Sequence, residues 1–161
     1  MRRAPIPISL RRPGGIAMKR LLIVATILFT GVGAVSADGD AIAQRQALMK
    51  ANGKAAKAMA DMLKGAPFDL AAVQEGLKTF ANAAAKAPAL FPDDSKTGGE
   101  TAALPAIWEN KADLNARFAK LGKDAADAMT AITDEASFKA NAPALFKNCG
   151  GCHENYRAKK S

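Results

Sequence analysis

Several residue types that carry protein chemistry are scarce in this chain of 161 residues. It has two cysteines, one histidine, one tryptophan and one tyrosine, and aromatic residues make up only 6% of it. A structural zinc site needs four Cys or His ligands, which this chain cannot supply. The runs of β-branched and aromatic residues that form strands are also missing. We therefore expect an all-helical protein without a zinc site.

Excess positive charge is confined to one end of the chain. The net charge is +8, but six of the 23 basic residues and none of the 15 acidic ones lie in residues 1–37. Residues 38–161 are therefore nearly neutral, with charges of both signs mixed along the chain. Binding to DNA or RNA needs a basic surface patch. We predict that the protein does not bind nucleic acid.

A short apolar run follows Lys19 and Arg20 and spans residues 21–29, with small residues at 35–37. A basic start, a short apolar core and a small-residue end are typical of a secretory signal peptide. The run is shorter than the ~20 apolar residues that a membrane span needs. We expect residues 1–37 to be removed on export, leaving residues 38–161 as a single soluble domain without stable membrane insertion.

Residues 1–17 have a composition that is unusual for an export signal, because they are rich in proline and arginine. Met18 is therefore a candidate for the true start of translation. N-terminal sequencing of the precursor would test this hypothesis.

Residues 38–161 space their apolar residues at helical intervals throughout. The first segment ends at 65–67, the second begins after the N-cap Asp69, and the third begins near Pro105. Pro143 should kink or restart the fourth helix near residue 139. Residues 88–103 are rich in Pro, Gly and Asp and predict a connecting loop. Four amphipathic segments predict an antiparallel up-down-up-down four-helix bundle.

The sequence Cys149-Gly150-Gly151-Cys152-His153 has the C-x-x-C-H pattern of c-type haem attachment. On a helix, thiols three residues apart lie on one side and can reach the two vinyl groups of a porphyrin. His153, four residues after Cys149, would place its imidazole beneath the ring as an iron ligand. A redox dithiol would follow a strand in a βαβ pattern, which is missing here. A haem-free protein with a Cys149–Cys152 disulfide is the remaining alternative.

A second axial ligand cannot be another histidine of the same chain, because His153 is the only one. Methionine is the natural soft ligand that remains, and residues 38–161 contain Met49, Met59, Met62 and Met129. In the predicted bundle, the end of the fourth helix lies beside the beginning of the first, which favours Met49. By its position alone, Met49 could as well only fill a gap in the core.

The C-x-x-C-H motif near the end of a four-helix chain, followed by residues 154–157, resembles the class II cytochromes c, the cytochrome c′ family. Residues 44–50 and 105–108 are also similar to that family, and the resemblance covers 38–161. It implies one haem c with its iron, bound by two thioethers in a four-helix bundle. It also implies a periplasmic location, redox proteins of unknown identity as partners, and in many members a homodimer.

The resemblance also implies roles for single residues. Met49 falls where the low-spin members, the cytochrome c556 type, carry their distal methionine and the high-spin members commonly carry leucine. Arg45 lies on the inward side, where an unpaired charge is costly. The family's Arg-Gln pair at this place binds a haem propionate, so we expect Arg45 and Gln46 to do so. Arg45 as a surface arginine is the alternative.

Arg157 matches the family's basic residue beside the proximal imidazole, although a solvent-facing cation at a helix end would fit there as well. The resemblance and the motif together predict a one-electron carrier, not an enzyme. A thioether ligand favours ferrous iron and raises the reduction potential. The alternative is a high-spin cytochrome c′ that binds nitric oxide or carbon monoxide at an open sixth position.

Overall fold

A computed structural model describes residues 37–159 of the chain. The predicted signal peptide, apart from its last residue, and the candidate start Met18 lie outside the described residues. Four long helices make up most of the described part, and a short helix and two 3₁₀ turns join the second long helix to the third. The long helices are α1 (Ala37–Leu63), α2 (Leu70–Lys86), α4 (Lys111–Ala131) and α5 (Glu135–Tyr156). The short elements are η1 (Ala87–Leu90), η2 (Asp93–Ser95) and α3 (Ala106–Glu109).

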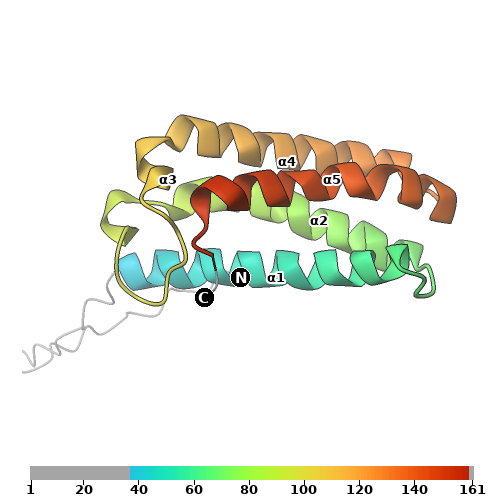
Figure 1. Ribbon diagram of the computed structural model, residues 1–161, viewed down its shortest axis with the longest axis horizontal. Helices are drawn as coiled ribbons and strands as arrows, with labels where there is room; N and C mark the ends of the chain where they lie inside the picture. The colour runs from blue at the N-terminus through green and yellow to red at the C-terminus, as the bar shows by residue number, and fades with distance from the viewer. Residues whose placement is uncertain (1–36, 160–161) are drawn as a thin grey trace, which may run out of the picture. The chain divides into compact units, whose positions relative to one another are not determined.

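Successive long helices run in opposite directions, so that the chain forms an up-down-up-down bundle (Figure 1). The connection between α1 and α2 and the connection between α4 and α5 lie at one end of it. The segment from η1 to α3 lies at the other end, together with the start of α1 and the end of α5. The predicted antiparallel four-helix bundle is confirmed.

Side chains fix where two of the helices begin. The carboxylate of Asp69 accepts a hydrogen bond from the backbone N–H of Ala72, at 3.0 Å, as expected for an N-cap. Asp134 and Ser137 form a reciprocal capping box at the start of α5, with Ser137 N at 2.7 Å from Asp134 Oδ1. These caps replace the backbone partners that the first turn of a helix lacks.

The predicted third and fourth helices differ from the observed ones. The third is interrupted at Asn110 (φ −129°, ψ 44°), whose side-chain amide donates to Ala106 O at 3.2 Å. The predicted restart near residue 139 is wrong, because α5 continues through Pro143. Pro143 and Lys139 are both exposed, so water can bond the Lys139 carbonyl that proline leaves without a donor.

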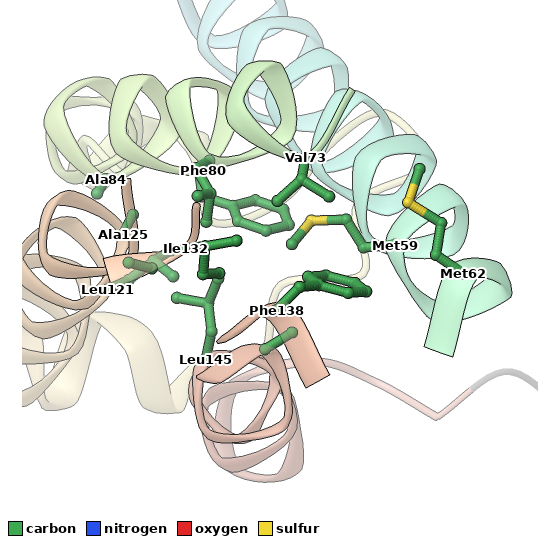
Figure 2. Packing of buried hydrophobic residues seen from close by; sticks show 13 residues of the cluster. Met59, Met62, Val73, Phe80, Ala84, Leu121, Ala125, Ile132, Phe138 and Leu145 are labelled. Carbon is green, nitrogen blue, oxygen red and sulfur yellow. The ribbon is translucent and has the colours of Figure 1, made fainter. Parts of the chain in front are cut away.

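Buried apolar side chains form two separate clusters. The larger cluster, called here the main core, draws on all four long helices. Figure 2 shows Met59 of this cluster lying between the rings of Phe80 and Phe138. The second cluster lies around the loop end and consists of Ala87, Ile107, Leu114, Phe118 and Tyr156. None of the helices within 37–159 is long and apolar enough to cross a membrane.

Candidate cofactor site

A cavity of about 310 Å³ lies between the first half of α1 and the last turns of α5. Its walls also include parts of the 91–103 segment, α3 and α4, and most of the side chains that form them are apolar. All seven residues that the sequence singled out line this cavity: Arg45, Gln46, Met49, Cys149, Cys152, His153 and Arg157. The fold therefore brings together residues that are more than 100 positions apart in the chain.

Near the end of α5, the side chains of Cys149, Cys152 and His153 lie within about one helical turn, and all three residues are partly buried. Both thiols are free, and burial raises the pKa of each above its ordinary value. Burial, followed by the nearby charge of Arg157, lowers the pKa of His153. The imidazole is therefore neutral at physiological pH, which is the form that ligates a metal.

Among the described methionines, Met49 alone lines the cavity. Met59 and Met62 are buried in the main core, and Met129 packs against it. Met49 packs instead against the second cluster, at the loop end of the bundle. A single thioether from α1 and a single imidazole from α5 thus face the same cavity.

Arg45 is only 4% exposed. It is held by the loop of residues 90–101, called here the crossing loop, which crosses this end of the bundle. Its guanidinium donates to Ser95 Oγ at 2.8 Å, Ser95 O at 2.9 Å, Leu90 O at 3.1 Å and Thr101 Oγ1 at 2.8 Å. It also lies 5.1 Å from the ring centre of Phe91. The protein itself therefore supplies hydrogen-bond acceptors for both terminal nitrogens of the guanidinium. The predicted alternative of a surface arginine does not fit this burial.

Gln46 and Arg157 are exposed residues at the rim of the cavity. The Gln46 amide donates to Glu100 O at 2.8 Å, so it too contacts the crossing loop. Arg157 is the C-cap of α5, and its neighbour Ala158 donates from its backbone N–H to Ala102 O at 2.8 Å. The segment that follows the crossing loop is therefore hydrogen-bonded to the end of α5, close to His153.

Sequence analysis missed a polar network on α4 that reaches the segment between the two cysteines. Arg117 donates from Nε to Asp113 Oδ2 at 2.6 Å and from Nη1 to Gly151 O at 3.0 Å. The Tyr156 hydroxyl donates to the same Asp113 oxygen at 2.6 Å. The i,i+4 spacing of Asp113 and Arg117 predicts an ordinary surface pair. The contact of Arg117 with Gly151 depends on how α4 and α5 pack.

The cavity fits a macrocycle that brings its own equatorial ligands. No group of three or more His, Cys, Asp or Glu side chains that could hold a bare metal ion occurs within 37–159. The cavity instead offers one imidazole and one thioether, two groups that could ligate the iron of a porphyrin. A Cβ atom built at Gly53, one turn after Met49, would meet nothing within 4 Å. The missing side chain leaves open space on the wall that faces α5.

The chain is similar to known cytochromes of one family. Residues 40–157 match the family model described as cytochrome C′. A cytochrome c′ of Rhodopseudomonas palustris is 51% identical over 88% of this chain and 98% of its own length. A cytochrome c-556 of Agrobacterium fabrum is 43% identical over 90% of this chain and 100% of its own length. A solved cytochrome c′ from Rhodopseudomonas palustris superposes with a TM-score of 0.74, at 55% identity, covering 76% of this chain and 98% of the other.

Proposed function

The chain belongs to the cytochrome c′ family, and from this premise we propose that it is an exported one-electron carrier whose haem iron is ligated by His153 and Met49. Members of this family carry a covalent haem c with iron and are proteins of the electron-carrier type. The observation that carries the proposal is the cavity that gathers the C-x-x-C-H motif on α5 and the one cavity-lining methionine on α1.

Each proposed role follows from where the side chain lies. Cys149 and Cys152 would hold the porphyrin by thioethers, and His153 and Met49 would hold the iron from α5 and α1. When bound, the haem supplies a centre that takes up and releases one electron. Because His153 and Met49 belong to helices of one bundle, they would hold the iron in the same way in both oxidation states, so little would have to rearrange when the electron moves. The mostly apolar wall excludes water, which together with a thioether ligand favours the ferrous form.

The remaining expectations are part of the same proposal. Gln46, at the rim, would bind a haem propionate together with Arg45, and Arg157 would lie on the proximal side. Arg45 would do so while it keeps its bonds to the loop.

Export and removal of residues 1–37 would place the protein in the periplasm, where its redox partners would be other proteins. Homodimer formation stays a prediction, which sedimentation of the holoprotein would test.

Absorption spectra of the oxidised and reduced holoprotein test the iron ligands. We expect a low-spin ferric spectrum with the far-red band of a sulfur-to-iron bond. Met49→Leu should remove that band and give a high-spin ferric spectrum, since leucine offers no ligand. Met62→Leu is the matched control, because Met62 lies in the main core and away from the cavity. A Met49→Leu protein that stays low-spin with the far-red band would show that Met49 is not the ligand.

A second candidate function is the binding of nitric oxide or carbon monoxide at an open sixth position. The 51% identity to a cytochrome c′, compared with 43% to a cytochrome c-556, favours this second candidate. Fast binding of carbon monoxide to the ferrous wild-type protein, together with a high-spin ferric spectrum, would support this function over the first. Slow binding that becomes fast in Met49→Leu would support the electron carrier.

A further inference from the structure

The polar network of Arg117, Asp113 and Tyr156 connects α4 to the haem-attachment motif. Arg117 contacts the backbone of Gly151, between the two cysteines, and its guanidinium lies 5.6 Å from the ring centre of Tyr156. One acidic oxygen, Asp113 Oδ2, accepts from both Arg117 and Tyr156. The guanidinium is therefore held from three sides, and its position relative to the motif is fixed.

The charges of this network are unequally placed with respect to the cavity. Arg117 and Tyr156 line it, whereas Asp113 is not among the lining residues. The Arg117 side chain is 34% exposed and that of Asp113 is 48% exposed, so water screens the carboxylate more than the guanidinium. The cavity wall at this point is consequently electropositive, although the pair as a whole is neutral.

A fixed positive charge beside a redox centre favours the state with less positive charge. Ferrous haem carries one positive charge fewer than ferric haem, so a nearby guanidinium raises the reduction potential. We infer that Arg117 is a positioning residue of the haem site, which holds the Gly151 segment against α4 and raises the reduction potential through its charge. This inference rests on the proposed function, since it requires a one-electron haem in this cavity.

Midpoint potentials of holoprotein variants test the inference. We expect Arg117→Gln to shift the ferric-to-ferrous ratio at a given applied potential at least threefold toward ferric, which is about 28 mV for one electron. Asp113→Asn should shift it in the opposite direction, because the guanidinium loses its counter-charge. Arg117→Lys keeps the charge and should stay within twofold of the wild type. Each shift should shrink as the salt concentration rises.

A role in packing alone would give a different pattern. If Arg117 acted only through packing, Arg117→Gln and Asp113→Asn would shift the midpoint potential in the same direction. That result would overturn the inference. So would an Arg117→Gln shift of less than twofold, or an Arg117→Lys shift as large as that of Arg117→Gln. If Arg117→Gln fails to fold, the opposite shift in Asp113→Asn and the small one in Arg117→Lys still decide.

Different measurements test the proposed function and this inference. The wild-type absorption spectrum reports the haem and its ligands, whereas the variant potentials report the effect of Arg117. A normal His and Met spectrum with unchanged variant potentials would refute the inference and leave the proposed function standing. A wild-type protein without haem would refute both.

Discussion

At the scale of single residues, Arg45 shows how one side chain can serve two neighbouring structures. Its backbone belongs to α1, one turn before Met49, while both terminal nitrogens of its guanidinium bond the crossing loop. A planar, always-charged group can make these bonds in fixed directions, whereas a lysine cannot. The loop that closes the cavity thus depends on α1 for its position.

Replacing Arg45 by methionine should destabilise the protein by about 3 kcal/mol, because acceptors at Ser95 and Leu90 lose a charged donor. Arg45→Lys should restore only part of this loss. Denaturant titration of the holoproteins measures both. Lys50→Met, which changes an exposed cation of the same helix, is the control and should change stability by about 0.5 kcal/mol or less. Equal stability of Arg45→Met and the wild type would contradict this account.

At the scale of helices, the start of α5 depends on one acidic cap. The backbone N–H of Ser137, followed by its hydroxyl, lowers the pKa of Asp134 below its ordinary value. A carboxylate whose pKa is lowered in the folded state stabilises the fold above its unfolded pKa. This stabilisation is lost as the pH falls through the folded pKa.

Asp134→Ala should therefore lower the melting temperature by several degrees at pH 7, because the first turn of α5 loses its acceptor. The difference from the wild type should shrink as the pH falls below the unfolded pKa of about 3.9. Asp134→Asn keeps an acceptor but has no titrating proton, so it should lie closer to the wild type at pH 7. Thermal melts followed by circular dichroism across this pH range provide the measurement. A difference independent of pH would contradict the electrostatic part of the explanation.

Helix boundaries show what helical spacing can and cannot predict. Asp69 is recognisable as a cap because a short acceptor stands directly before an apolar stripe. The interruption at Asn110 leaves no gap in the stripe from Ile107 to Leu114, so spacing alone does not reveal it. Pro143 instead predicts a break that does not occur. The Lys139 carbonyl that loses its backbone donor is exposed, so water can bond it and α5 continues.

At the scale of the whole molecule, the described part has two unequal apolar clusters. The main core contains thirteen buried residues, whereas the second cluster, beside the cavity, contains five. Burial of apolar surface stabilises in proportion to its area. The cavity end therefore has little packing of its own, and a bound haem would add apolar surface to it.

A Cys149→Ser/Cys152→Ser protein, which cannot form thioethers, should lose stability unevenly. Amides of α3 and of the last turn of α5 should exchange hydrogen at least tenfold faster than in the holoprotein, because they depend on the second cluster. Amides around Phe80 and Phe138 should keep most of their protection. Hydrogen exchange followed by mass spectrometry measures both regions. Uniform loss of protection would show that the two clusters do not act separately.

The sequence alone determined the helical bundle and the haem-attachment motif that lines the cavity. Apolar spacing depends only on the order of residues, and the C-x-x-C-H motif places its three side chains within one turn of a helix. Tertiary structure alone decided what holds Arg45 and that Arg117 reaches Gly151. These contacts join residues that are 34 or more positions apart. They depend on the rotation and offset of packed helices, which local spacing does not specify.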